Sequence, residues 1–226
     1  MVATQKFISA SILSADFSRL GEEAKQIIDA GVDYIHFDVM DHHFVPNLSF
    51  GAVVCKALRH TKITVPIDVH LMVDNPDVYI KPFAEAGASL ITFHPEIVKN
   101  VEGTIELIHQ AGMRSGLAFN PDKSVSLLPP LILKQVNLVL LMSVNPGFSG
   151  QVFMPNSLER ISFTRKLLDE VHSKAMLGID GGIKADNIME VSCAGANFFV
   201  VGSGLFYASN YKEEVKTLRQ QLHFDN

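Results

Sequence analysis

Eight short apolar runs alternate with longer amphipathic segments along almost the whole chain. The runs are rich in β-branched, aromatic and aliphatic residues and lie at residues 7–12, 33–39, 65–72, 89–94, 114–119, 136–142, 175–180 and 197–202. Polar, glycine or proline residues follow each run, and a helix-like stretch comes next. This alternation predicts repeated βα units and therefore a parallel sheet.

The first unit shows the helical part of the pattern. Between residues 17 and 31 the apolar side chains recur at helical spacing, and Gly31 suits a C-terminal cap. Its expected apolar face consists of Leu20, Ala24, Ile27 and Ile28.

Eight such units fit either a closed barrel or an open sheet with helices on both faces, because periodicity alone does not decide closure. The polar residues favour the barrel. They follow the second, third, sixth, seventh and eighth runs, and the carboxyl ends of all strands of a closed barrel converge at one mouth. We therefore predict an α/β fold, a single (β/α)8 TIM barrel that spans residues 1–226.

Composition limits the partners of this fold. A net charge of −5 gives no reason to expect nucleic acid or an anionic membrane, both of which select clustered Lys and Arg. The N-terminal residues do not resemble a secretory signal, and no apolar run approaches the about 18 residues that a membrane helix needs. We expect a cytoplasmic protein that contacts neither nucleic acid nor membrane.

The two cysteines, Cys55 and Cys193, are far apart in the sequence. They form no CxxC pair, which argues against a thiolate zinc site and against a disulfide framework. We expect both to be buried thiols.

Four residues near the ends of predicted strands have the chemistry of a metal site. His36 and Asp38 are two residues apart, so both side chains point to the same side of an extended strand. His70 ends the third run and Asp180 ends the seventh, so the four converge at one barrel mouth. This set of nitrogen and oxygen ligands suits one divalent ion, zinc, iron(II), manganese or cobalt, better than calcium.

Taken singly, each of these residues is better explained as a core histidine or a helix-capping carboxylate, but this explanation is much weaker for all four together. Burying Asp38 and Asp180 among apolar neighbours is costly, however, unless a cation offsets the lost hydration. Asp68 shares a face with His70 and could be a further ligand, but we rank it below the four and expect a structural group or one that orients the His70 imidazole.

Three methionines, Met40, Met72 and Met142, lie at or just beyond strand ends. They either fill the core or form a water-excluding wall around the reacting centre, and the sequence favours neither interpretation.

Three glycine-containing segments, residues 145–153, 180–182 and 202–206, follow the sixth, seventh and eighth runs. Each alone is explained by the needs of a turn. Together they place backbone amides where barrel enzymes often bind phosphate, and we predict a phosphate site there.

Six blocks of this sequence resemble the ribulose-phosphate 3-epimerase family. They are SASILSADFSRLG, HFDVMDHHFVPN, IDVHLMV, LMSVNPGFSGQVF, IDGGI and VVGSGLF, in that order, between Ser9 and Phe206. Many members of the family have glycine where this chain has His42 and Ser149, which puts the geometry of these two loops in question.

The resemblance implies roles for individual residues. Asp38 and Asp180 would be the acid and base on opposite faces of the substrate, and with His36 and His70 they would bind the metal. Ser11 would hold the sugar, and further substrate and phosphate contacts would come from His70, Gly147, Phe148, Ser149, Gly150, Gly181, Gly182, Gly202 and Ser203.

The implied activity is the interconversion of D-ribulose 5-phosphate and D-xylulose 5-phosphate at carbon 3, a step of the pentose phosphate pathway, by a homo-oligomeric enzyme. Three rivals remain. A related epimerase for allulose 6-phosphate would use the same groups, whereas a lyase or decarboxylase would be expected to place a lysine at the reacting carbon. A sugar-phosphate sensor would not require two opposed aspartates.

Overall fold

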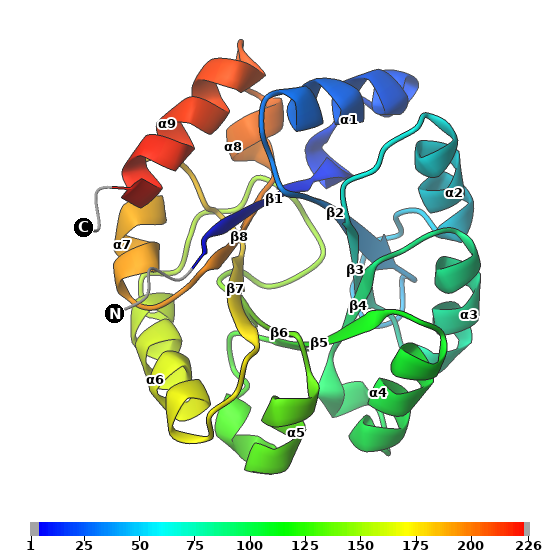
Figure 1. Ribbon diagram of the computed structural model, residues 1–226, viewed down its shortest axis with the longest axis vertical. Coiled ribbons are helices and arrows are strands. Elements are labelled where there is room, and N and C mark those ends of the chain that lie inside the picture. Colours follow the sequence, from blue (N-terminus) through cyan, green and yellow to red (C-terminus); the bar gives the residue numbers. More distant parts are fainter. Residues whose placement is uncertain (1–4, 224–226) are drawn as a thin grey trace.

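The computed structural model describes residues 5–223, which form a closed barrel of eight parallel strands surrounded by helices (Figure 1). Each strand pairs with its neighbours in the sequence, and β1 closes the barrel against β8. The predicted (β/α)8 barrel is confirmed.

All eight predicted strands are present. They are β1 (Phe7–Ser11), β2 (Tyr34–Met40), β3 (Ile67–Met72), β4 (Leu90–Phe93), β5 (Arg114–Phe119), β6 (Leu138–Met142), β7 (Met176–Asp180) and β8 (Phe198–Val201).

The α-helices of the described chain are α1 (Leu20–Asp29), α2 (Ala52–His60), α3 (Asp77–Glu85), α4 (Val101–Gln110), α5 (Pro130–Gln135), α6 (Ser157–Glu170), α7 (Ile188–Cys193), α8 (Ser203–Phe206) and α9 (Tyr211–His223). Short 3-10 turns are η1 (Ile12–Ser14), η2 (Phe17–Arg19), η3 (Pro95–Ile97) and η4 (Val125–Leu127).

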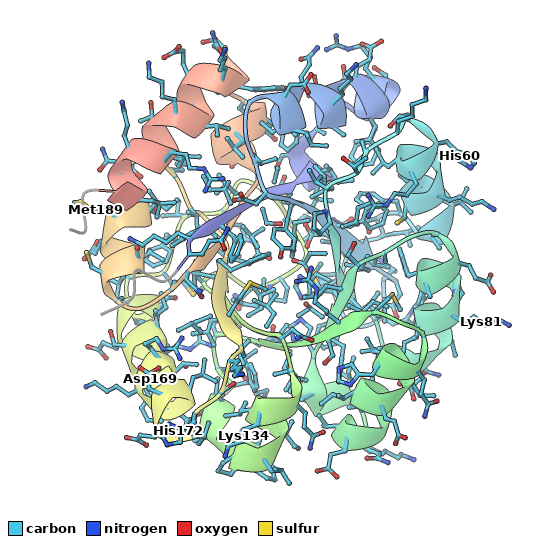
Figure 2. The ribbon with its side chains drawn as sticks, viewed as in Figure 1. His60, Lys81, Lys134, Asp169, His172 and Met189 are labelled. Atoms are coloured by element: carbon cyan, nitrogen blue, oxygen red, sulfur yellow. The ribbon has the colours of Figure 1, made fainter. Side chains whose placement is uncertain are left out.

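The hydrophobic core has two layers because successive strand residues point alternately inward and outward. The outer layer packs the barrel against the helices and contains Phe37, Phe83 and Phe93 among its fully buried side chains. The inner layer fills the barrel with Tyr34, Leu90, Ala118, Leu138, Leu140, Met142, Phe198 and Val200. Polar side chains on the helix ring, such as Lys81 and Asp169, point outward (Figure 2).

Hydrogen bonds join the two ends of the described chain at the amino-terminal side of the barrel. The Lys6 ammonium donates to the Leu222 carbonyl at 2.8 Å, and Arg219 on α9 donates to the Lys6 carbonyl at 3.2 Å. The Arg219 guanidinium also pairs with Asp33, just before β2. Helix α9 therefore fastens the first strands in place.

The expectation of two buried thiols holds for only one of the cysteines. Cys55 is buried as expected, but burial was wrong for Cys193, which is exposed because the buried face of α7 consists of Ile188, Val191 and Ser192. Within residues 5–223, none of the helices combines the length and apolar character needed to cross a bilayer.

Candidate active site

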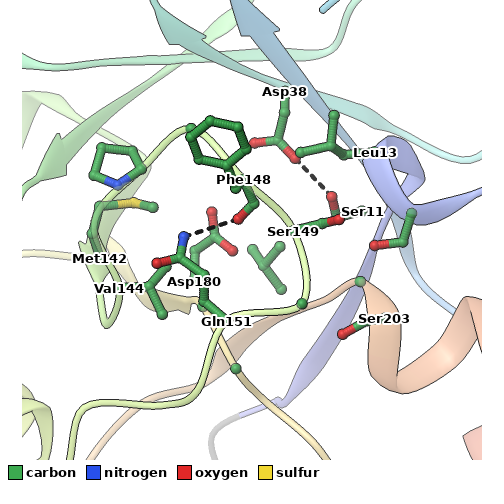
Figure 3. A pocket seen from close by; sticks show the side chains of 18 of the residues that line it. Ser11, Leu13, Asp38, Met142, Val144, Phe148, Ser149, Gln151, Asp180 and Ser203 are labelled. Atoms are coloured by element: carbon green, nitrogen blue, oxygen red, sulfur yellow. Dashed lines mark hydrogen bonds between the residues drawn. The ribbon is translucent and has the colours of Figure 1, made fainter. Parts of the chain in front are cut away.

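A pocket opens at the carboxyl ends of the strands, where the polar strand ends were predicted to meet. Most of the predicted site residues line it: Ser11, Asp38, Met40, Met72, Met142, Gly147, Phe148, Ser149, Gly150, Asp180, Gly181, Gly182, Gly202 and Ser203. The Asp38 and Asp180 side chains point into it from β2 and β7 (Figure 3). His36 and His70 do not line the pocket; they are fully buried behind the aspartates.

The two histidines and two aspartates form one compact cluster. Nε2 of His36 lies 3.2 Å from Oδ1 of Asp38 and 3.6 Å from Oδ2 of Asp180. Nδ1 of His70 lies 3.3 Å and 3.7 Å from the same two oxygens. One atom from each of the four residues lies within 4.8 Å of the others, so the cluster could hold one metal ion.

Strand register brings these residues together. Asp38 and His70 are direct partners in the β2–β3 ladder, and His36 is paired with Asp68 two residues earlier. All four side chains point into the barrel because the side chains of a strand alternate between its two faces. Asp180 is the last residue of β7 and completes the cluster from another part of the barrel wall.

The surroundings of His36 fit a metal ligand. Its Nδ1 donates to Oδ2 of Asp68 at 2.7 Å, and Thr92 donates to the other Asp68 oxygen at 3.2 Å. The remaining nitrogen, Nε2, is buried, faces the aspartates and has no hydrogen-bond partner among the described residues. A buried imidazole nitrogen without a partner, held by a carboxylate on its other side, is the usual arrangement of a metal-binding histidine. Asp68 therefore orients His36 and is not in the cluster of ligand atoms.

Charge interactions within the cluster are strong. Burial alone would lower the pKa of His36, but the carboxylates of Asp38, Asp68 and Asp180 outweigh burial and raise this pKa well above its usual value. Burial would raise the pKa of Asp38, but His36 and His70 hold this pKa far below its usual value. A proton on His36 and a divalent cation therefore compete for the same carboxylates.

Two hydroxyl groups fix the aspartates. Ser11 on β1 donates to Oδ2 of Asp38 at 2.6 Å (Figure 3). Oδ1 of Asp38 is left facing the histidines. Ser143 donates to the backbone carbonyls of Asp180 and Gly181 at 2.8 and 2.7 Å. The two Ser143 bonds hold the backbone at the carboxyl end of β7 in place.

A second pair of polar residues behind the cluster was not predicted. Nε2 of His94 lies 3.0 Å from Nε2 of His70, and Nδ1 of His94 lies 3.5 Å from Oε1 of Glu96. His94 is fully buried, and burial lowers its pKa to about 4. The available signal was a histidine that ends the fourth apolar run, followed two residues later by a carboxylate.

The three methionines are almost fully buried and also line the pocket. Met40 and Met72 pack with Val45 into a small apolar cluster against Leu13 and Phe44. The two interpretations of these residues, core filling and pocket wall, therefore describe the same side chains.

Glycines shape the opposite side of the pocket. Gly181 and Gly182 follow β7 with φ angles of 118° and 68°, and a Cβ on Gly182 would lie 2.3 Å from the Phe153 amide nitrogen. Gly147 and Gly150 in the loop after β6 also have positive φ angles, 124° and 78°. Side chains would strain or block these turns, so glycine suits all four positions.

The two residues that depart from the family pattern are both accommodated. His42 has a φ of 63°, so it adopts the left-handed conformation that glycine favours and that histidine tolerates better than most residues. Ser149 does not have a positive φ, since the described non-glycine residues with positive φ are His42, Lys62 and His172. The backbone conformation at position 149 therefore does not require glycine.

A model of the family described as "Ribulose-phosphate 3 epimerase family" matches residues 7–206, which is most of the chain. The chain belongs to the ribulose-phosphate 3-epimerase family. This membership confirms the resemblance, and it makes the chain an epimerase, an isomerase that acts on carbohydrates.

Members of the epimerase family are similar over nearly the full chain. The ribulose-phosphate 3-epimerase of Buchnera aphidicola subsp. Acyrthosiphon pisum (strain APS) is 52% identical over 218 residues, 96% of this chain and 95% of that protein. The ribulose-phosphate 3-epimerase of Escherichia coli (strain K12) is 48% identical over 218 residues, 96% of each chain.

Solved structures of lower identity show the same fold. A 3-hexulose-6-phosphate synthase superposes with a TM-score of 0.72 at 16% identity, covering 96% of this chain and 99% of its own. Orotidine 5'-phosphate decarboxylase from Pyrococcus horikoshii OT3 superposes with a TM-score of 0.66 at 15% identity, covering 95% and 98%.

The epimerase pocket also contains residues that sequence reasoning did not select: Leu13, Ser14, Val144, Pro146, Gln151, Ile183 and Val200. Gln151 donates to the carbonyls of Asn145 and Phe148 and so braces the loop after β6 (Figure 3). Most of these residues lie inside or next to the family blocks, so the blocks themselves were the available signal.

Proposed function

We propose that the chain interconverts D-ribulose 5-phosphate and D-xylulose 5-phosphate at carbon 3. The observation that carries this proposal is the placement of two carboxylates, Asp38 and Asp180, on different strands around one candidate metal cluster at the floor of the pocket. The names of the relatives, ribulose-phosphate 3-epimerases at about half identity, support this choice of substrate.

The chemistry requires two acid–base groups. Inversion at carbon 3 removes a proton from one face and delivers a proton to the other, which one fixed carboxylate cannot readily do. In our proposal Asp38 and Asp180 act from opposite faces, each as base in one direction and acid in the other. Both carboxylates approach Nε2 of His36, Asp38 at 3.2 Å and Asp180 at 3.6 Å.

The proton at carbon 3 is acidic only when the neighbouring carbonyl can accept negative charge. His36, His70, Asp38 and Asp180 would hold one divalent cation, zinc, iron(II), manganese or cobalt, which would supply Lewis acidity for the negative charge that develops on the substrate. Ser11 keeps the Asp38 carboxylate turned so that one oxygen is tied to the hydroxyl and the other faces the cluster. Each aspartate would thus bind the cation and also transfer a proton.

The phosphate group would bind at the glycine side of the pocket. Gly147, Gly150, Gly181 and Gly182 allow backbone amides to approach, and Gly202 and Ser203 continue this wall after β8. Ser14 also lines this wall, and its buried hydroxyl has no hydrogen-bond partner among the described residues. Met40, Met72 and Met142 would exclude water on the other side, which strengthens electrostatic interactions.

The wider setting follows from this activity. We infer one catalytic domain over residues 1–226, acting in the pentose phosphate pathway of the cytoplasm with a sugar phosphate as its small-molecule partner. Assembly into a homo-oligomer stays a prediction from the family resemblance.

Replacement of each aspartate tests the proposal directly. We expect Asp38→Asn and Asp180→Asn each to reduce turnover by several orders of magnitude, because each removes both a proton-transfer group and a charged ligand. Asp169→Asn, on the exposed face of α6, is the matched control and should retain wild-type turnover.

Proton NMR of the metal-loaded protein in deuterium oxide provides the readout. Formation of xylulose 5-phosphate with deuterium at carbon 3 supports the proposal. Near-normal turnover by either metal-loaded active-site variant would exclude the two-base scheme. Faster turnover of allulose 6-phosphate than of ribulose 5-phosphate would instead reassign the substrate.

A further inference from the structure

We propose that His94 and Glu96 are positioning residues that fix the proton of His70 on Nε2 and so keep its Nδ1 available to the metal. This inference rests on the proposed metal site and adds two residues to it that lie outside the candidate ligand set and do not line the pocket. His70, His94 and Glu96 form what we call the relay, a chain of side-chain contacts from the cluster toward the protein surface.

The two ring nitrogens of His70 face different partners. Its Nδ1 faces the Asp38 and Asp180 carboxylates at 3.3 and 3.7 Å. An imidazole binds a cation through an unprotonated nitrogen, so a His70 that binds through Nδ1 must carry its proton on Nε2. The tautomer is therefore decided by whatever lies at Nε2.

The neighbour of Nε2 of His70 is the ring of His94. Nε2 of His70 is 3.0 Å from Nε2 of His94, and both rings are fully buried. Two nitrogens at this distance share one proton, because two N–H groups would collide and two lone pairs would repel. When His70 donates, His94 must accept, and the proton of His94 is then on Nδ1.

The Glu96 carboxylate lies next to the Nδ1 proton of His94. Nδ1 of His94 is buried, has no hydrogen-bond partner within normal distance among the described residues, and lies 3.5 Å from Oε1 of Glu96. The same oxygen accepts from the Asn120 amide at 2.9 Å, which holds the carboxylate in place. The negative charge of Glu96 favours the Nδ1–H form of His94 and disfavours the alternative tautomer.

The arrangement has a counterpart on the other side of the cluster. Asp68 orients His36 directly through a 2.7 Å bond to Nδ1, which leaves Nε2 for the metal. Glu96 orients His70 through one intervening ring, which leaves Nδ1 for the metal. The ring of Phe44 packs on His94 with centroids 4.7 Å apart and restricts its rotation.

Three variants test the relay. His94→Leu removes the acceptor from Nε2 of His70, whereas His94→Gln places an amide oxygen in the same region. Glu96→Gln removes the charge and introduces an amide N–H that favours the wrong tautomer of His94. His109→Gln is the matched control, because His109 bonds Ser115 at the amino-terminal end of β5, away from the pocket.

The primary readout is the affinity for cobalt(II), measured by competition with a chelator, together with the visible spectrum of the bound cobalt. We expect His94→Leu to weaken binding by about 10- to 100-fold and to change the spectrum. We expect a smaller loss in His94→Gln, a loss of roughly a few-fold in Glu96→Gln, and no change in His109→Gln.

The outcomes separate the relay from the metal site itself. If the wild-type protein binds no cobalt, the proposed metal site is wrong. If the wild type binds cobalt and Glu96→Gln and both His94 variants bind it equally well with the same spectrum, the relay is wrong. Equal losses in the Leu and Gln variants of His94 would indicate packing alone and would also overturn it.

Discussion

At the scale of single residues, the pocket depends on positions where the backbone leaves no room for a side chain. A Cβ on Gly182 would lie 2.3 Å from the Phe153 amide nitrogen, at a φ of 68°. Gly112, after α4, has a similar φ of 80°, but a Cβ there would meet nothing within 4 Å. Alanine substitutions at Gly112 and Gly182 therefore separate two contributions to the free energy of unfolding, one from the left-handed backbone and one from the steric clash.

We predict that Gly112→Ala lowers the free energy of unfolding by about 1 kcal/mol, the ordinary cost of a left-handed non-glycine residue. Gly182→Ala should cost more, roughly 2 kcal/mol or above, because the loop after β6 must also move. It should raise KM for the sugar phosphate at least several-fold, whereas Gly112→Ala keeps the wild-type KM. Urea unfolding and steady-state kinetics measure both quantities, and equal effects of the two substitutions would contradict the steric argument.

Single residues also mark the limit of what the sequence could predict about the site. The convergence of His36, Asp38, His70 and Asp180 followed from strand alternation and strand ends alone. Asp68 was expected to be a structural or orienting group beside His70, but the imidazole that it bonds is His36. His94 was missed because a histidine at a strand end looks like any core histidine, and its contact with His70 depends on the stagger between β3 and β4.

At the scale of elements, the segment between β2 and α2 is tied down by side chains and forms one edge of the pocket. The Asp41 carboxylate accepts from the amides of His43, Phe44 and Asp74 at 2.8 to 3.0 Å. Asn47 donates to the Gly147 carbonyl at 2.6 Å and joins this segment to the loop after β6. Asp41 thus holds this segment in place, and the segment in turn contacts the glycine-containing loop after β6.

The stability contributed by Asp41 should depend on pH. Burial alone would raise the pKa of Asp41, but the amides of Asp74, His43 and Phe44 outweigh it and lower the pKa below 3.8. A lowered folded-state pKa means that the contribution is complete above the unfolded pKa, near pH 4, and disappears as the pH falls through the folded value.

We therefore predict that Asp41→Asn lowers the free energy of unfolding by about 1 kcal/mol at pH 7 and that this difference shrinks below pH 4. Urea unfolding of both proteins at a series of pH values measures it, with Asp169→Asn as the surface control. A difference that stays constant down to pH 2.5 would show that the carboxylate charge contributes nothing.

The bounds of the elements were predictable only approximately, for local reasons. The third run was expected to begin at Val65, but β3 begins at Ile67 because Pro66 has no N–H for the ladder. The Pro66 carbonyl still accepts from Ile35 at 3.0 Å. The first helix was expected over 17–31, yet η2 precedes α1 because Asp16 caps residues 17–19 as a separate turn. Gly31 does have the positive φ of a helix C-terminus, 108°.

At the scale of the whole molecule, the ring of helices seals the outer core from solvent. Cys55 on α2 is fully buried and its thiol points at the Ala86 carbonyl after α3, 3.7 Å away. Burial raises the pKa of this thiol to about 11, so very little reactive thiolate is present at pH 8. Labelling of Cys55 therefore reports opening of the packing between α2 and α3.

We predict that, in a Cys193→Ser background, Cys55 resists thiol reagents at pH 8 and is modified only at the rate of unfolding. Mass spectrometry of the labelled protein over time gives that rate, and urea should accelerate it in parallel with loss of the circular dichroism signal. Rapid modification of the folded protein would show instead that the α2–α3 contact opens locally.

The pairing of β1 with β8 has a consequence for how the protein is made. Phe7 and Phe198 are partners in one ladder, so the barrel cannot close until nearly the entire described chain exists. A ribosome adding about 5–20 residues per second takes roughly 10 to 40 s to reach β8. During that time one edge of β1 has no partner strand and is exposed to other nascent chains. A chaperone that shields this first strand would therefore raise the yield of folded protein without affecting the stability of the finished barrel.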